Sequence, residues 1–226
     1  MPRATGRATL RLVTGCSRLA AVIILLLGTQ SAKSLAIAPA ALAEPNSVRQ
    51  ARAELERLTV AKPHPLHTYK RAEFMTDWSR QKGACDTREI VLLLNAWTVG
   101  RDAACSPISG IWYSPYDGRT LTSTDQIDVD HVVPLANAWI SGADTWSPAR
   151  RHAFANDVVR PELIPVSESS NLAKGGHSPA NWRPSVTEYW CTYARAWITV
   201  KHHYRLHITS REKNALDDML DTCPSS

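Results

Sequence analysis

The chain lacks the sequence signatures of the common zinc proteins. No Cys-x-x-Cys pair occurs, and the His-Glu-x-x-His motif is absent. Structural zinc sites are built from such closely spaced cysteines and histidines, and zinc peptidases place both histidines of the motif on one face of a helix. A zinc-finger fold and a zinc enzyme acting on cell-wall peptides are therefore both disfavoured. The sequence also has no internal repeat and no low-complexity segment.

Acidic residues are missing from the first 43 positions. Arginines precede the apolar run 19–27, and the triplet at 41–43 has the small-x-small pattern of a cleavage site. This arrangement predicts a secretory signal peptide over 1–43, with Ala36 and Ala40 as alternative cleavage points. The apolar run is too short to span a membrane comfortably. We expect no stable membrane association after the leader is removed, and a retained amphipathic anchor is the alternative.

An excess of charge is also absent from the predicted mature chain. The formal net charge of the 226 residues is +5, but five of the 26 basic residues lie in 1–43. The remainder has 21 basic and 21 acidic residues. Net charge therefore gives no argument for a polyanionic partner, and any such argument depends on local patches. Residues 44–226 are enough for a single domain.

Four cysteines remain when Cys16 leaves with the leader. An even number in an exported chain predicts two disulfides. Three pairings are possible. We favour Cys85–Cys105 and Cys191–Cys223, because each pair lies within one locally folded segment.

Hydrophobic periodicity and turn residues predict a mostly helical α+β chain. Helical spacing and caps are found over the following ranges: 47–60, 69–78, 88–97, 135–140, 148–156, 169–175, 187–203 and 210–223. Strand patterns are found over these ranges: 110–121, as a hairpin with Asp117-Gly118 at its turn, 127–133 and 163–166. The two last strands can pair as the arms of a hairpin with a long connection, followed by a short helix.

The chemically richest stretch is the strand over 127–133. Its alternation places Asp128 and Asp130 on one side, and His131 follows at the strand end. Asn171 begins the short helix that follows the last strand. A one-metal phosphodiesterase needs a hard oxygen ligand, an imidazole that takes a proton from water, and a second oxygen ligand. We expect Asp128 to be a structural hydrogen bonder and the other three residues to form a site.

The sequence around this strand resembles a known family. The motifs are DVDHVVP at 128–134, FAND at 154–157, NLAKG at 171–175 and PANWRP at 179–184. Together they resemble the HNH endonucleases of the ββα-metal superfamily, in particular the secreted bacterial branch related to the C-terminal domain of GmrSD-type restriction enzymes. The resemblance covers about residues 110–184. It implies a ββα-metal core embedded in a mostly helical, disulfide-stabilised domain over 44–226.

The resemblance also implies roles for individual residues. His131 corresponds to the general base that deprotonates the attacking water. Asp130 and Asn171 correspond to the protein ligands of one divalent metal ion. A carboxylate, an amide oxygen and several waters favour Mg²⁺, with Mn²⁺ or Zn²⁺ as alternatives.

Further residues are expected to assist these three. Lys174, Arg151 and Arg183 are candidates for contacts with substrate phosphates. The middle Asn of the HNH signature, which orients the histidine, is replaced by Glu162. We expect either Glu162 to accept a hydrogen bond from the histidine or Asn156 to substitute for the missing residue.

The expected function is metal-dependent hydrolysis of phosphodiester bonds in nucleic acid, with DNA favoured over RNA. Without a recognisable reader module, most contacts would go to phosphates, so we expect weak sequence preference. The protein is expected to act outside the cell as a monomer. The alternative is an exported binding protein that keeps the scaffold but has weak or no catalysis, which the replacement at Glu162 makes plausible.

Overall fold

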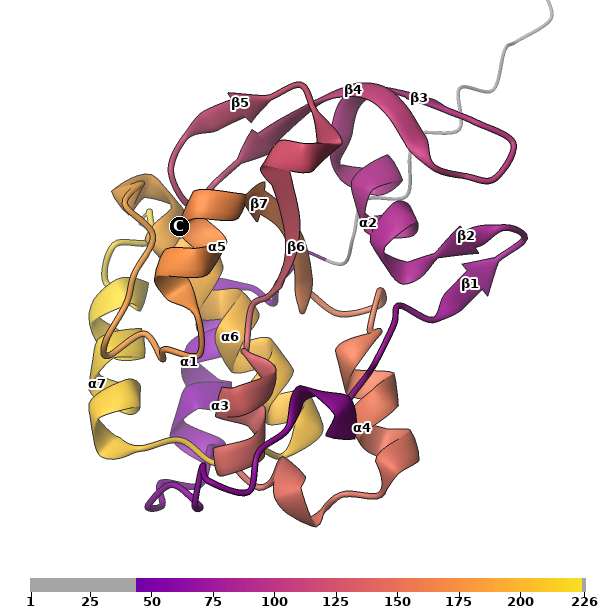
Figure 1. The fold of residues 1–226 in the computed structure, drawn as a ribbon. Helices are drawn as coiled ribbons and strands as arrows, with labels where there is room; N and C mark the ends of the chain where they lie inside the picture. Colours follow the sequence, from indigo (N-terminus) through magenta and orange to yellow (C-terminus); the bar gives the residue numbers. More distant parts are fainter. Residues whose placement is uncertain (1–43, 225–226) are drawn as a thin grey trace, which may run out of the picture. The chain divides into compact units, whose positions relative to one another are not determined.

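The computed structural model describes residues 44–224. The predicted signal peptide over 1–43 lies outside the described residues. The described part combines helices with three small antiparallel sheets, which confirms the predicted α+β class (Figure 1). None of the helices within 44–224 is both long and apolar enough to cross a membrane.

The elements follow the chain in the order of their labels. The α-helices are α1 Val48–Arg57, α2 Thr87–Asn95, α3 Leu135–Ile140, α4 Pro148–Ala155, α5 Glu168–Lys174, α6 Trp190–Tyr204 and α7 Ser210–Leu220. The 3₁₀ helices are η1 Arg71–Glu73, η2 Thr124–Gln126, η3 Ala143–Thr145 and η4 Thr187–Tyr189. The strands are β1 Arg80–Lys82, β2 Cys85–Asp86, β3 Ala96–Arg101, β4 Pro107–Ser114, β5 Arg119–Leu121, β6 Ile127–His131 and β7 Leu163–Ser167.

The strands β6 and β7 form the pair that the sequence predicts. They run antiparallel, with Asp130 opposite Ile164 and His131 opposite Leu163. A connection containing α3, η3 and α4 joins them, and α5 follows β7 directly. Ser167, the last residue of β7, caps α5 by accepting a hydrogen bond from the Ser170 amide.

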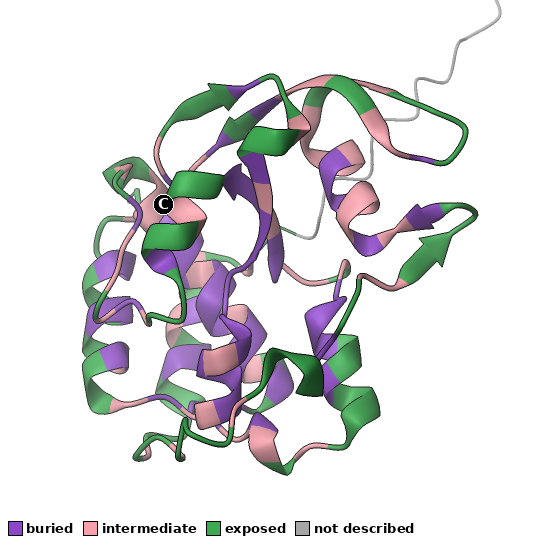
Figure 2. Ribbon diagram, viewed as in Figure 1, coloured by how far each residue is buried: buried purple, intermediate pink, exposed green. Residues whose placement is uncertain are grey.

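The two sides of β6 have different surroundings. Ile127 and Val129 are buried against Val91 and Leu92 of α2 and against Trp112 of β4. The alternate residues face the other side, where α5 packs on β6. In Figure 2 both β6 and β7 are largely buried, whereas much of α5 is exposed. The alternation predicted from the sequence is therefore confirmed, and it leaves the carboxylates on the side of α5.

A second and larger core lies among the helices α1, α3, α6 and α7. Its members include the fully buried side chains of Leu55, Tyr193, Trp197 and Leu216. The Trp197 indole donates a hydrogen bond to the buried Glu212, at 2.7 Å. This helical layer supports α3, which follows β6 along the chain.

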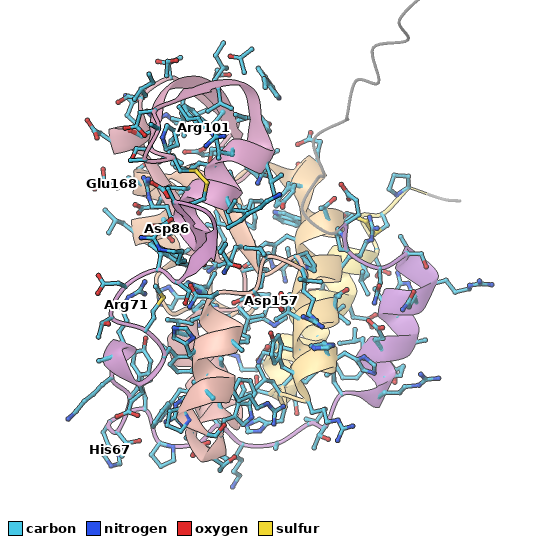
Figure 3. All side chains as sticks on the ribbon, turned by 90° about the vertical axis from the view of Figure 1, so that its right-hand side faces the viewer. His67, Arg71, Asp86, Arg101, Asp157 and Glu168 are labelled. Atoms are coloured by element: carbon cyan, nitrogen blue, oxygen red, sulfur yellow. A yellow bond between two sulfur atoms is a disulfide. The ribbon has the colours of Figure 1, made fainter. Side chains whose placement is uncertain are left out.

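Both predicted disulfides are present. Cys85 is joined to Cys105, and Cys191 is joined to Cys223. The first bond connects β2 to the loop between β3 and β4, and Figure 3 shows it as the yellow bond below the Arg101 label. The second connects α6 to the segment that follows α7.

Some predicted boundaries were wrong. The helix expected over 69–78 is only the 3₁₀ turn η1. The helix expected to reach Trp97 ends at Asn95, because β3 begins at Ala96 and pairs with β4. The helix expected over 169–175 begins one residue earlier, at Glu168, and is capped by Ser167. The strands β1, β2 and β3 had no counterpart among the predicted elements.

Candidate functional site

A cleft of about 360 Å³ lies where β6 ends and α3 begins. Its walls come from η1 with the residues before it, from β6, from the start of α3 and from α5 with the glycines that follow. The lining residues are Tyr69, Arg71, Val129, Asp130, His131, Pro134, Leu135, Ala136, Asn171, Leu172, Gly175 and Gly176. The structure therefore brings three predicted site residues, Asp130, His131 and Asn171, into one cleft.

The imidazole of His131 is held in one orientation. Its Nε2 lies 2.9 Å from the backbone carbonyl oxygen of Ala155. A carbonyl can only accept, so Nε2 carries the proton, and Nδ1 of the neutral ring is an acceptor. The ring of Trp78 stacks on the imidazole with 5.5 Å between centroids and 12° between planes. Residues 44–224 offer no hydrogen-bond partner to Nδ1, which leaves it available to a ligand in the cleft.

Burial lowers the pKa of His131 to about 3. The hydrogen bond to Ala155 acts in the opposite direction, while the positive charges of Arg71 and Lys174 lower the pKa further. The imidazole is therefore neutral at physiological pH, which is the protonation state that a general base requires.

Asp130 lies at the cleft, but its carboxylate already has partners. It accepts a hydrogen bond from the Tyr116 hydroxyl at 2.7 Å and another from the Lys174 ammonium at 2.9 Å. Burial raises the pKa of Asp130, and the charge of Lys174 opposes this rise. A carboxylate has about four lone-pair positions, so Asp130 keeps acceptor capacity for one further partner.

The predicted phosphate contact by Lys174 is wrong. The side chain is fully buried, and its ammonium group donates to Asp130 and, at 2.8 Å, to the backbone carbonyl of His131. A buried ammonium requires such partners because its desolvation is costly. Lys174 therefore fixes the end of β6 and neutralises Asp130, and it does not reach a ligand.

The two arginines predicted to contact phosphates, Arg151 and Arg183, do not line the cleft. Arg151 is a buried residue of α4, and its guanidinium donates to the backbone carbonyl oxygens of Glu73 and Trp146. Arg183 pairs with Asp218 on α7 at 3.2 Å and lies over the Trp190 ring. Neither arginine lines the cleft, since the helical layer holds both of them elsewhere.

The orienting contact on His131 comes from the backbone, and neither predicted side chain makes it. Glu162 is fully buried and accepts from the Val133 amide at 3.1 Å. Asn156 accepts from the Ser79 amide and the Thr87 hydroxyl, at 2.9 and 2.8 Å.

The role of Asn156 is therefore indirect. It ties the segment that follows Trp78 to the end of α4, next to the carbonyl of Ala155 that holds the imidazole of His131. Ala155, which precedes Asn156 in the sequence, makes the contact with the imidazole ring of His131.

Asn171 lines the same cleft as His131 and Asp130. Its Nδ2 donates to a carboxylate oxygen of Asp128 at 2.8 Å. A carboxylate only accepts, so this bond fixes the amide orientation and leaves the Asn171 Oδ1 without a partner among residues 44–224. The expected structural role of Asp128 agrees with this hydrogen bond.

The oxygens of the cleft fit a hard divalent cation. Mg²⁺ is commonly held by one or two protein oxygens and keeps several waters. The free Oδ1 of Asn171 and the remaining lone pairs of Asp130 supply such a set. Within 44–224 there is no cluster of three or more His, Cys, Asp or Glu side chains suited to a metal.

Three residues of the site escaped sequence reasoning. Arg71 lines the cleft from η1, Trp78 stacks on His131, and Tyr116 binds Asp130. Each comes from a segment more than ten residues before the strand β6, so no local pattern places them there. Arg71 has no salt bridge within residues 44–224, which distinguishes it from Lys174 as a candidate phosphate contact.

Comparison with known proteins agrees with the motifs. The family described as "GmrSD restriction endonucleases, C-terminal domain" matches residues 95–219, and the chain belongs to this family of nucleases. A protein of Arthroderma benhamiae named "Uncharacterized secreted protein" is 44% identical over 200 residues, which is 87% of this chain and 98% of that protein. No solved structure matches the chain.

The pKa of Glu162 allows a test of its buried state. Burial raises this pKa well above its usual value of 4.5, and nearby Asp130 and Asp157 also raise it, whereas the Val133 amide and Lys174 lower it. A raised pKa in the folded state means that stability is present at low pH and is lost as pH rises above 4.5. Glu162→Gln, which cannot ionise, is therefore expected to raise the melting temperature relative to wild type more at pH 8 than at pH 5.

Thermal unfolding of both proteins at the two pH values measures this difference. An equal change at pH 5 and pH 8 would show that Glu162 does not titrate with folding.

Proposed function

We propose that this protein is a secreted, metal-dependent HNH endonuclease that hydrolyses phosphodiester bonds of DNA with weak sequence preference. The observation that carries the proposal is the imidazole of His131, which has Nε2 bound to a carbonyl and Nδ1 available in a cleft beside the free oxygen of Asn171. The arrangement of β6, β7 and α5 agrees with a ββα-metal core, and the family is one of restriction endonucleases.

The proposed chemistry is the attack of water on phosphorus. The Nδ1 of His131 takes the proton from the attacking water, the new bond forms between the water oxygen and phosphorus, and the bond to the leaving sugar oxygen breaks. The leaving oxygen is then protonated from solvent. Ala155 and Trp78 hold the imidazole in place, and the burial of the ring keeps it neutral before the reaction.

Asn171 and Asp130 would hold the divalent cation, which we expect to be Mg²⁺. When bound, such a cation stabilises negative charge on the phosphate and on the leaving oxygen. Asp128 would hold the amide of Asn171 with its oxygen directed away from Asp128.

In this proposal Arg71 is the phosphate contact, in place of Lys174, Arg151 and Arg183. It lines the cleft, and its charge acts on His131. Arg71→Ala is expected to lower kcat/KM for DNA about 10-fold or more, because a hydrogen bond from a charged group contributes about 1.5–3 kcal/mol. Plasmid nicking rates over a range of DNA concentrations measure the effect.

The matched control is Arg49→Ala, which removes an exposed arginine of α1. Its rate should equal that of wild type. If both variants lost activity equally, the effect of Arg71 would be one of general charge rather than of a contact in the cleft.

Secretion is supported by the name of the 44% identical relative and by the two disulfides. Disulfides are typical of proteins in oxidising compartments outside the cytosol. We propose removal of residues 1–43 and a single nuclease domain over 44–226 that acts as a monomer.

A substrate panel tests the function. The oxidised protein, residues 44–226, is incubated in Mg²⁺ with supercoiled plasmid, single-stranded DNA and RNA, and the products are separated by size. The proposal predicts nicked and then linear plasmid, with DNA cut faster than RNA. Retarded but intact nucleic acid would instead identify the catalytically inactive binding protein that is the alternative.

A further inference from the structure

We propose that the outer face of the sheet β3–β4–β5 is a second nucleic-acid contact, on which bases of a single-stranded segment stack after the strand leaves the cleft. The proposal rests on the proposed function and extends it, since it adds a substrate surface outside the catalytic cleft. The surface consists of Trp97 and Tyr113, with Arg101 at the end of β3 and Arg119 on the edge strand β5, and we call it the stacking surface.

Two aromatic rings form its centre. Trp97 of β3 is 67% exposed and Tyr113 of β4 is 39% exposed. Within residues 44–224, no other tryptophan or tyrosine is among the exposed large hydrophobic side chains. The two rings lie 6.2 Å apart between centroids, with only 8° between their planes. Successive bases in a strand also lie parallel, so a base stack can lie along both rings.

The fold holds Tyr113 on the outer face. Trp112, its neighbour, is fully buried and donates a hydrogen bond from its indole to the carbonyl of Leu92 in α2 at 2.8 Å. The ring of Trp112 covers Gly110, where an added Cβ would overlap the indole. Since adjacent residues of a strand point to opposite faces, an inward Trp112 directs Tyr113 outward.

Two exposed arginines lie on the strands of the same sheet. Arg101 ends β3, and Arg119 begins β5 opposite Ser114, so its side chain lies on the face of Ser114 and reaches toward α5. Neither forms a salt bridge in the part of the chain that the structure describes, so both charges are available to phosphates. Aromatic faces beside unpaired arginines are the combination that binds single strands without sequence preference.

The stacking surface is continuous with the cleft. Arg119 donates a hydrogen bond to the hydroxyl of Ser169 at the start of α5, at 3.3 Å. Farther along α5, Asn171 and the 72% exposed Leu172 line the cleft. The seven residues of α5 span about 10 Å at 1.5 Å per residue, and Figure 1 shows this helix beside β6 and β7 and below β5. A strand of a few nucleotides can therefore run from the cleft across α5 to the rings.

The occupant is a single strand because the faces of paired bases are stacked on each other within a duplex. Stacking on a side chain requires a base whose face is free. A duplex would meet this surface only through its phosphates and the two arginines. The aromatic pair therefore predicts tighter binding of single-stranded than of double-stranded oligonucleotides.

Binding without cleavage tests the proposal. Fluorescence anisotropy of labelled oligothymidylate is measured in chelator with wild type, Trp97→Ala, Tyr113→Ala and the conservative Trp97→Phe. Each alanine variant is expected to bind about tenfold or more weakly, from the stacking of one base, and Trp97→Phe should restore most of the affinity. Val159→Ala is the matched control, since it removes an exposed apolar side chain (65% exposed) from the connection between α4 and β7.

A second measurement separates this surface from catalysis. Hydrolysis of the small diester bis(p-nitrophenyl) phosphate in Mg²⁺ should be the same for Trp97→Ala and wild type, because the substrate has no strand to reach the sheet. Unchanged oligothymidylate affinity in folded Trp97→Ala and Tyr113→Ala, or an equal loss with Val159→Ala, would overturn the stacking surface. Wild type that binds oligothymidylate tightly through Trp97 yet cuts nothing would keep the stacking surface and reject the nuclease.

Discussion

His131→Ala is expected to abolish cleavage of plasmid DNA, with a fall in rate of about 10²–10⁴-fold. The imidazole is the basic nitrogen group of the cleft, and its Nδ1 has no partner within residues 44–224, while Nε2 is bound to Ala155. Its removal leaves no group positioned to take the proton of the attacking water. Nicking rates under saturating Mg²⁺ measure this loss.

The buried position of His131 requires a second variant. Alanine leaves a space between Trp78 and the Ala155 carbonyl, so His131→Ala loses some stability as well as activity. His131→Gln keeps most of the volume and an amide donor for the carbonyl, but it has no basic nitrogen. His177→Ala, at an exposed position, is the matched control. A folded His131→Gln protein that cuts at the wild-type rate would contradict the assigned base.

Lys174→Met is expected to lower the free energy of unfolding by about 3–5 kcal/mol. The variant removes the ammonium that lies 2.9 Å from the carboxylate of Asp130 and leaves that carboxylate buried without its counter-charge. For a protein of this size, a loss of that order lowers the melting temperature by roughly 10 °C. Urea and thermal denaturation of the oxidised protein measure it.

A surface pair provides the control for Lys174. Lys213→Met breaks the salt bridge between Lys213 and Glu56, and the side chain of Glu56 is 70% exposed. Exposed pairs contribute about 0–1 kcal/mol, so this variant should remain close to wild type. The double variant Lys174→Met with Asp130→Asn should recover part of the lost stability. If the single variant Lys174→Met kept the wild-type melting temperature but had a raised KM for DNA, Lys174 would instead be a phosphate contact.

The sequence predicted the elements whose signals are local. The alternation of apolar and acidic residues over β6 predicted a strand with its carboxylates on one side, and both disulfides follow from locally folded segments. The helix α2, predicted over 88–97, begins with a capping box of Asp86 and Glu89. These features depend on neighbours a few residues apart, so one sequence is enough to detect them.

The errors concern contacts between distant segments. Lys174 was expected to contact a phosphate, but α5 packs its stem under the end of β6, beside Asp130. Trp78 and Arg71 approach His131 from a segment more than fifty positions earlier, and no pattern in the sequence encodes that approach. The contact that orients the imidazole comes from a backbone carbonyl, which any residue at position 155 could supply.

The central claim is that the cleft around His131 and Asn171 hydrolyses phosphodiester bonds with the help of a divalent cation. The most direct measurement is nicking of supercoiled plasmid by the oxidised protein in Mg²⁺, then after addition of a chelator, and again after Mg²⁺ is restored in excess. The proposed mechanism predicts nicking in Mg²⁺, arrest in chelator and recovery when Mg²⁺ is restored. Nicking that continues unchanged in chelator, or intact plasmid throughout with a folded protein, would contradict it.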